Sequence, residues 1–204
     1  LITIANPNQP IEVIIKDKDI IRLCKLAKKN NSLLVVDEAY FHFNKISAIG
    51  LIKKFKNLVV VRTFSKAFGL AGLRIGYVVA SNDIIRYLRI LKPIYEINNI
   101  NLEISEYFLK NLKIMRNYVQ QVASSRTLFK LKMKQLHYAV YGKYSNTMLL
   151  DLKNKKNLDR IFKYLFNKKI LTKKTIFEGK YYLRCTVGDL NSTKRLIKEI
   201  YKCH

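Results

Sequence analysis

Lys66 follows a short apolar run and comes directly before a series of small residues. The run at residues 58–61 is rich in β-branched side chains, which is typical of a strand buried on both faces of a parallel sheet. Lys66 therefore lies just past the carboxyl end of that strand, the edge at which open α/β sheets bind their ligands. A partly desolvated lysine in this position can act as an amine nucleophile.

Two residues near Lys66 carry side chains that suit a phosphate group. Ser65 supplies a hydroxyl donor and Arg74 a fixed positive charge, and the glycines between residues 69 and 76 allow close approach of the backbone. The alternative is an ordinary surface lysine followed by a glycine-rich turn. The unbroken run of specific residue types over 62–77 disfavours that alternative and indicates a lysine that anchors a cofactor.

The segment SKAFGLAGLRIGY at residues 65–77 resembles the lysine motif of class I/II aminotransferases, which have fold type I and use pyridoxal 5'-phosphate (PLP). The similarity is greatest to the histidinol-phosphate aminotransferase branch. Three more segments resemble motifs of this family in the same order: NPNQP at 6–10, VVDEAY at 35–40 and YLRCTVG at 182–188. The resemblance implies the C-terminal part of a large α/β domain with a mostly parallel sheet, followed by a small α+β domain.

The resemblance also implies roles for the residues of the site. Lys66 is expected to bind PLP covalently and to be the catalytic residue, and Arg184 to bind the acid group of the substrate. The other residues expected to bind the cofactor are Asp37, Tyr40, Ser65, Arg74 and, in altered geometry, Gln9. The implied partners are a small-molecule amino donor and an oxo-acid acceptor, and relatives are homodimers that share active-site residues.

Chemistry supports Asp37 independently of the resemblance. This residue ends the apolar run at 33–36, so its carboxylate is desolvated unless it meets a cation. A protonated pyridine nitrogen is such a cation, and its charge lets the ring accept electrons. A helix cap or a salt bridge is the alternative, which the place of Lys66 one strand later disfavours. Tyr40 matches a tyrosine that hydrogen-bonds the ring's phenolic oxygen, and a core aromatic is its alternative.

The chain departs from the family pattern in three places. Gln9 replaces an asparagine that reaches the ring oxygen of PLP, and its longer stem alters that contact or abolishes it. Thr172 stands where many relatives have an arginine for the substrate's phosphate, with Lys173 and Lys174 as the nearby cations. The chain begins at Leu1, so we expect the family's N-terminal portion, with the turn that caps the PLP phosphate, to be absent.

Three other functions stay open on the sequence. A PLP-dependent decarboxylase on the same fold keeps Lys66 and Asp37, and it releases carbon dioxide where an aminotransferase forms an oxo acid. A truncated and inactive fragment is the second alternative. The third is a basic nucleic-acid binder. For Arg184 itself, the alternative to binding the substrate's acid group is a strand-edge arginine that faces solvent.

The pattern of apolar residues predicts an alternation of helices and strands. A helix over 20–27, capped by Asp17 or Asp19, precedes strands near 33–37, 58–64 and 75–80. A helix from 84 must end before Pro93, and a loop follows at 92–98. The predicted domains are a partial PLP-binding domain at 1–100, a long connecting helix at 101–135 and a small domain at 136–204. Within the small domain we expect strands at 138–141, 147–152 and 181–187 and helices at 156–168 and 193–202.

Composition predicts a cytoplasmic protein without a membrane span. The 204 residues are 49% hydrophobic, enough for one core and a satellite domain, and no apolar run is long enough to cross a bilayer. Three scattered cysteines favour a reducing compartment, and the three histidines lack the spacing of metal ligands, so no metal is expected.

The charge of the chain is strongly positive, with 39 basic and 14 acidic residues and a net charge of +25. The basic residues are spread along the sequence and fall mainly at predicted helix ends and turns, where solvated lysine is common. Nucleic-acid binding is therefore disfavoured. It would need a basic stripe on one face of the folded chain.

Overall fold

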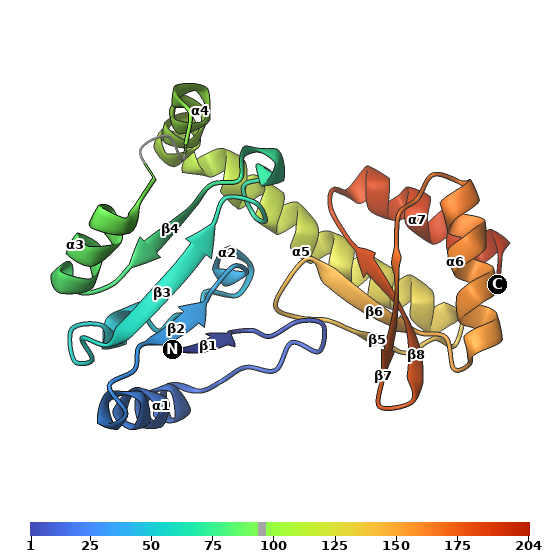
Figure 1. Ribbon diagram of the computed structural model, residues 1–204. Helices are drawn as coiled ribbons and strands as arrows, with labels where there is room; N and C mark the ends of the chain where they lie inside the picture. The colour runs from blue at the N-terminus through green and yellow to red at the C-terminus, as the bar shows by residue number, and fades with distance from the viewer. Residues whose placement is uncertain (94–96) are drawn as a thin grey trace. The chain divides into compact units, whose positions relative to one another are not determined.

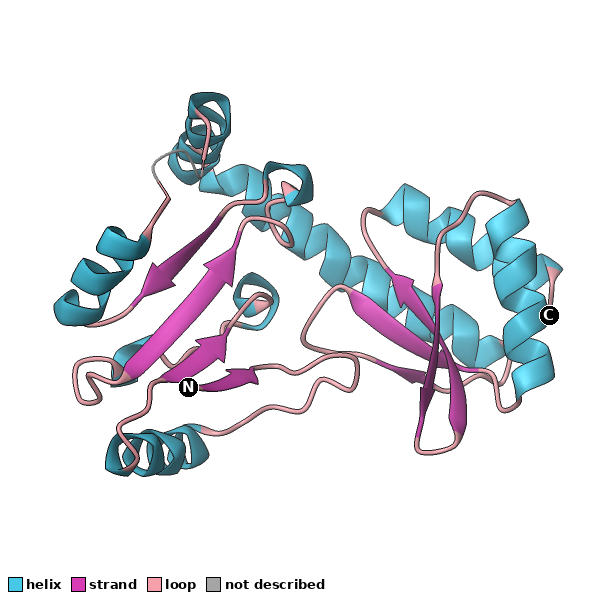
Figure 2. Ribbon diagram, in the orientation of Figure 1, coloured by secondary structure: helices cyan, strands magenta, loops and turns pink. Residues whose placement is uncertain are grey.

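The computed structural model describes residues 1–93 and 97–204, which form two compact units. The first contains Leu1–Gln9 and Val13–Arg116, and the second contains Pro10–Glu12 and Asn117–His204. Each unit has its own four-stranded sheet (Figure 2). The domain limits expected from the sequence remain predictions.

The sheet of the first unit has the strand order β1-β2-β3-β4. Strands β1 (Ile2–Ala5), β2 (Leu34–Asp37) and β3 (Leu58–Thr63) are parallel, and β4 (Gly76–Val79) is antiparallel to β3 (Figure 1). The carboxyl ends of the three parallel strands and the amino end of β4 therefore lie at one edge of the sheet. This is the edge at which ligand binding was expected from the sequence.

One face of this sheet is covered by helix α1 (Asp17–Lys29) and by the segment at 48–55. The buried core between them consists of Ile20, Cys24, Ala27, Leu34, Val36, Ala48, Ile52, Phe55, Leu58 and Val60. Helix α1 carries acidic residues in its first turn and Lys28 and Lys29 in its last turn. These charges stabilise the helix by interacting favourably with its dipole. Strands β2 and β3 are therefore central in the sheet, and Leu34, Val36, Leu58 and Val60 of the two apolar runs are buried against this layer.

Short helices lie between these strands. Helix α2 (Phe41–Asn44) and the 3-10 helix η1 (Ile49–Leu51) connect β2 to β3, and the 3-10 helix η2 (Ala71–Leu73) connects β3 to β4. Helix α3 (Asn82–Leu91) follows β4. The loop expected at 92–98 includes residues 94–96, which lie outside the described residues.

The long helix expected over 101–135 is two helices, α4 (Asn99–Lys110) and α5 (Leu112–Gln135). Asn111 leaves the helical region at φ −116° and ψ 49°, and its side-chain amide donates to the carbonyl of Tyr107 at 2.8 Å. Asparagine side chains that bond to nearby carbonyls compete with the backbone bonds of a helix, which accounts for the break at Asn111. The apolar pattern of the sequence continues on both sides of the break and does not reveal it. None of the helices in the described residues has both the length and the apolar character to cross a membrane.

The sheet of the second unit is antiparallel, in the order β5-β6-β8-β7. Its strands are β5 (Val140–Tyr141), β6 (Thr147–Asp151), β7 (Lys173–Phe177) and β8 (Lys180–Thr186). Helices α6 (Lys155–Asn167) and α7 (Leu190–Lys202) bury apolar faces in this unit. Asn154 and Asp189 cap their first turns, accepting from the backbone N–H of Asn157 and Ser192.

A buried carboxylate holds residues 10–12 in the second unit. Glu12 is 6% exposed and accepts hydrogen bonds from the backbone N–H groups of Lys143 and Tyr144 and from the hydroxyl of Ser145. Arg126 donates to the carbonyl groups of Lys143 and Ser145 on the same loop. These bonds satisfy a charge whose burial is otherwise costly.

Candidate active site

A cavity of about 290 Å³ opens at the carboxyl edge of the first sheet. Four of the residues predicted for the site line it together: Asp37 at the end of β2, Ser65 and Lys66 just after β3, and Arg74 just before β4. The other lining residues are Ala39, Val61, Arg62 and Thr63. Asp37 and Lys66 line the same cavity because β2 and β3 are parallel, which brings the carboxyl ends of both strands to the same edge of the sheet.

Buried aromatic neighbours fix the backbone around Lys66. Phe64 and Phe68 lie on either side of it in the sequence, are both buried, and have ring centroids 4.7 Å apart. Lys66 is half-buried, and its Nζ lies 5.6 Å from the centroid of the buried Tyr40 ring. The amine is therefore directed over an aromatic face, where a cation is stabilised.

Asp37 has a charge that the described residues leave unmatched. Its Oδ1 accepts the backbone N–H of Ala39 at 2.9 Å, and no cationic side chain among residues 1–93 and 97–204 forms an ion pair with it. The carboxylate is half-buried at the strand end. A cationic group of a ligand is the partner that this position calls for.

Arg74 and Ser65 are held by the turn between β3 and β4. Arg74 has a left-handed backbone at φ 56°, and its guanidinium donates to the carbonyl of Ala71 at 3.1 Å. The N–H of Ser65 donates to the hydroxyl of Thr63 at 3.0 Å. Gly76 begins β4 where a Cβ atom would lie 2.6 Å from the carbonyl oxygen of Arg62, so only glycine fits the pairing.

A buried ion pair between Arg62 and Glu38 lies beside the cavity, and it was not predicted from the sequence. Arg62, a lining residue, donates through Nε and Nη2 to Glu38 Oε2 at 3.0 and 2.9 Å, and the two side chains are 9% and 0% exposed. Glu38 also accepts from the hydroxyl of Ser47 and the N–H of Ala48. The guanidinium carbon lies 3.4 Å from the ring centroid of Phe41. An arginine within a strand was the available signal, because such a charge needs a partner.

His42 is packed among rings near this pair. Its ring contacts Phe41 and Phe68 edge-on, with centroids 5.1 and 5.0 Å apart. Its Nε2 is buried and has no hydrogen-bond partner among the described residues. Burial, and then the charges of Lys45 and Arg62, lower the pKa of His42 from 6.5 to about 4. The imidazole is therefore neutral at physiological pH.

The remaining predicted residues do not line the cavity. Tyr40 contacts Lys66 from outside the lining set, and Gln9 lies in a turn after β1 at the same edge of the sheet. Arg184 belongs to the second unit, in β8, where it pairs with Leu149 of β6 and Lys173 of β7. Their roles remain predictions.

The donor set of the cavity fits PLP. Lys66 offers an amine for the aldehyde and Asp37 an unmatched carboxylate for the ring nitrogen. Ser65 and Arg74 offer a hydroxyl and a guanidinium for the phosphate.

Comparison with known proteins agrees with this geometry. Residues 1–200 match the family model described as aminotransferase class I and II. A histidinol-phosphate aminotransferase of Thermoanaerobacter sp. (strain X514) is 37% identical over 203 residues, which cover 97% of this chain and 55% of the relative. The chain thus spans about half the length of the curated relatives that it matches.

Solved structures of the same type share the fold. The histidinol-phosphate aminotransferase of Clostridium acetobutylicum aligns with a TM-score of 0.83 at 21% identity, covering 98% of this chain and 62% of that one. The Sinorhizobium meliloti histidinol-phosphate aminotransferase, solved in complex with PLP, aligns with a TM-score of 0.80 at 20% identity and covers 99% and 57%. The α/β architecture is therefore that of fold type I aminotransferases.

Proposed function

The chain belongs to the aminotransferase class I and II family, and from this premise we propose that it acts in a PLP-dependent transaminase resembling histidinol-phosphate aminotransferase. The reaction moves an amino group between an amino acid or amino-phosphate substrate and a 2-oxo acid. The observation that carries the proposal is the cavity in which Lys66, Asp37, Ser65 and Arg74 meet.

The residues of the cavity divide the work between anchoring and proton transfer. When bound, PLP supplies an electron sink for negative charge on the substrate's α-carbon. With PLP bound, Lys66 would hold the cofactor through its Nζ, and the same amine, when free, would take the proton from the substrate's α-carbon as a general base. Asp37 holds a proton on the ring nitrogen, since an ionised carboxylate favours the charged form of its partner.

The other residues hold the cofactor in place. Ser65 and Arg74 bind the phosphate through a hydroxyl and a fixed charge. With PLP bound, the hydroxyl of Tyr40 would donate to the ring oxygen, and the amide of Gln9, in the turn after β1, would lie toward the same oxygen. Tyr40 is buried and lies against Lys66, which supports its assignment.

Arg184 is assigned to the acid group of the substrate. In the second unit, β7 and β8 place Lys173 directly opposite Arg184. Like charges at directly opposed positions destabilise a strand pair, and an anion between them removes the repulsion. This register supports the assignment of Arg184 to a carboxylate and of Lys173 to a substrate phosphate.

We further propose that the working enzyme is a homodimer of the cytoplasm. Cys24, Cys185 and Cys203 are free and buried, as expected of a protein that folds in a reducing compartment.

The proposal is tested by trapping the cofactor. Purified chain is mixed with PLP, the visible absorbance of the lysine adduct is followed, and the adduct is reduced with borohydride for peptide mapping. We expect one labelled peptide, which contains Lys66. Lys66→Ala abolishes this label, and the matched change Lys54→Ala, at an exposed lysine of the same unit, leaves it in place. A label spread over surface lysines and insensitive to Lys66→Ala contradicts the proposal.

The reaction type is tested with histidinol phosphate and a 2-oxo acid. Transamination gives an oxo product and ping-pong kinetics, because the amino group is carried by the enzyme between two half-reactions. Release of carbon dioxide from an amino-acid donor, without an oxo product, indicates the decarboxylase alternative.

A further inference from the structure

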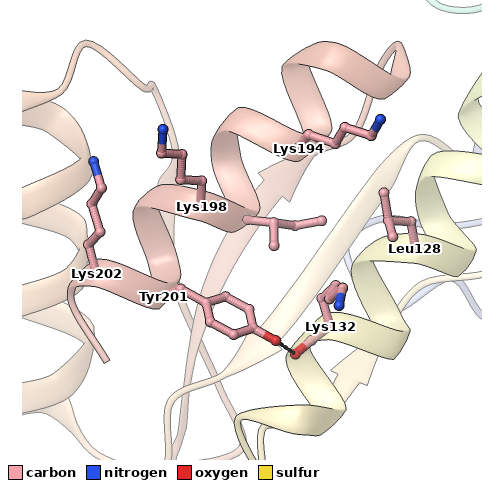
Figure 3. A pocket seen from close by; sticks show the side chains of 7 residues that line it. Leu128, Lys132, Lys194, Lys198, Tyr201 and Lys202 are labelled. Carbon is pink, nitrogen blue, oxygen red and sulfur yellow. Dashed lines mark hydrogen bonds between the residues drawn. The ribbon is translucent and has the colours of Figure 1, made fainter.

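A groove of about 540 Å³ lies on the second unit, between the second half of α5 and α7 (Figure 3). Its apolar lining consists of Leu128 from α5 and Ile197 and Tyr201 from α7. Ile197 is 8% exposed and forms the floor, whereas Tyr201 is 39% exposed. The residues of this groove take no part in the proposed aminotransferase chemistry.

The tyrosine ring is fixed in place by α5. The hydroxyl of Tyr201 bonds to the carbonyl of Lys132 at 3.0 Å (Figure 3). The same hydroxyl bonds to Oε1 of Gln135 at 2.9 Å. A rigid aromatic wall costs little conformational entropy when a ligand binds. The groove is therefore formed before any partner arrives.

Four lysines surround this apolar lining. Lys194, Lys198 and Lys202 project from successive turns of α7, and Lys132 stands on α5 (Figure 3). Two of them have partners, since Lys202 pairs with Glu199 at 2.9 Å and Lys132 donates to Gln135 at 3.2 Å. Neither Lys194 nor Lys198 has an acidic partner within the described parts of the chain.

The spacing of these charges defines the ligand. A rise of 1.5 Å per residue separates Lys194 from Lys198 by about 6 Å along the helix axis, the same distance as two carboxylates four residues apart on another helix. An aliphatic floor between the lysines requires apolar groups on the same ligand face. Nucleic acid lacks such a face, and none of the helices in the described residues carries two carboxylates four residues apart, so a second copy of this chain does not offer the matching surface.

We propose that the groove binds an acidic amphipathic helix of a partner protein, with leucine-type side chains on Ile197 and Leu128 and carboxylates on Lys194 and Lys198. This is the helix-in-groove mode of recognition, in which apolar anchors supply affinity and charges supply orientation.

The probe for the test is a fluorescein-labelled helical peptide with leucines on one face and glutamates on the other, titrated with the full chain by fluorescence anisotropy. We expect saturable binding that weakens with salt, because the charged contacts are exposed. A peptide of the same composition with a scrambled order lacks the apolar face and is expected to bind at least roughly tenfold more weakly.

The variant Lys194→Glu/Lys198→Glu is expected to weaken binding by about tenfold or more. The matched control is Lys25→Glu/Lys29→Glu on α1, where two exposed lysines have the same four-residue spacing and the change in net charge is identical. Leu128→Ser tests the apolar part and is expected to weaken binding with all lysines present. Circular dichroism checks that each variant is folded.

Three results overturn the proposal. They are equal binding of the ordered and scrambled peptides, equal effects of the two double variants, and competition by duplex DNA or anionic vesicles that bind with the same dependence on Lys194 and Lys198. Photo-crosslinking of the peptide to the unmodified chain guards against a variant that fails to fold. Crosslinks must map to α5 and α7, and crosslinks elsewhere also overturn the proposal.

Discussion

At the scale of single residues, His42 links packing to pH. Its pKa of about 4 in the folded chain lies below the ordinary value of 6.5 because burial disfavours the charged ring. Between pH 6.5 and about 4 the unfolded chain binds a proton that the folded chain does not. The free energy of unfolding is therefore expected to fall as the pH is lowered through this window.

This expectation is measured by urea unfolding of the wild type and of His42→Phe across the same pH range. Carboxylates titrate there as well, so the difference between the two proteins isolates the histidine. The free energy of unfolding of the wild type minus that of the variant should fall as the pH is lowered, because the wild type carries the cost of the buried histidine and the phenylalanine variant does not. A constant difference across the window would show that His42 does not carry this pH dependence.

The buried pair of Glu38 and Arg62 gives a second prediction at this scale. Glu38→Gln leaves a guanidinium buried without its counterion, which costs about 3–5 kcal/mol of unfolding free energy. Replacing both residues by Gln and Met is expected to cost less than the sum of the single changes, because no unpaired charge remains. Chemical denaturation of the four proteins in a double-mutant cycle checks this. Additive effects contradict a direct pair.

The residues of the cavity were predictable to different degrees. Lys66, Ser65 and Arg74 lie within one continuous motif, and Asp37 ends a strand that is recognisable by itself. The Glu38–Arg62 pair joins positions 24 residues apart. Its formation depends on how β2 and β3 align, and the sequence does not give that register.

At the scale of elements, the start of β4 depends on one glycine. Gly76→Ala places a methyl group 2.6 Å from the Arg62 carbonyl, so the β3–β4 pair must separate. A loss of about 1–3 kcal/mol in unfolding free energy is expected, as for other overpacked sites. Gly50→Ala in η1 is the matched control, since nothing lies within 4 Å of its added carbon. Thermal unfolding compares the two, and equal stability of both variants contradicts the close approach.

Elements with a strong apolar pattern were predictable, and those held by their neighbours were not. The apolar runs at 33–36 and 58–61 supply most of β2 and β3, where Leu34, Val36, Leu58, Val59 and Val60 are buried. Strand β7 is mostly exposed and has no such pattern, and it exists because it pairs with β8 along its length. The break at Asn111 was missed for the opposite reason, since the apolar stripe continues on both sides of it.

At the scale of the whole molecule, the net charge of +25 opposes the compact state. Added sodium chloride screens this repulsion, so the thermal midpoint is expected to rise with salt, by roughly 2–4 °C for each ~1 kcal/mol gained. Differential scanning fluorimetry in sodium chloride and in choline chloride separates screening from a specific ion effect. A midpoint that falls or stays level in both salts contradicts the expectation.

The path of the chain between its two units limits how the protein can be dissected. Because residues 10–12 belong to the second unit and their flanks to the first, a gene cut after Arg116 does not yield two self-contained pieces. Such a cut puts Glu12 on one polypeptide and the amides and hydroxyl of Lys143, Tyr144 and Ser145 on the other. The C-terminal piece then has unsatisfied donors, and complementation in trans requires the N-terminal piece to return that carboxylate.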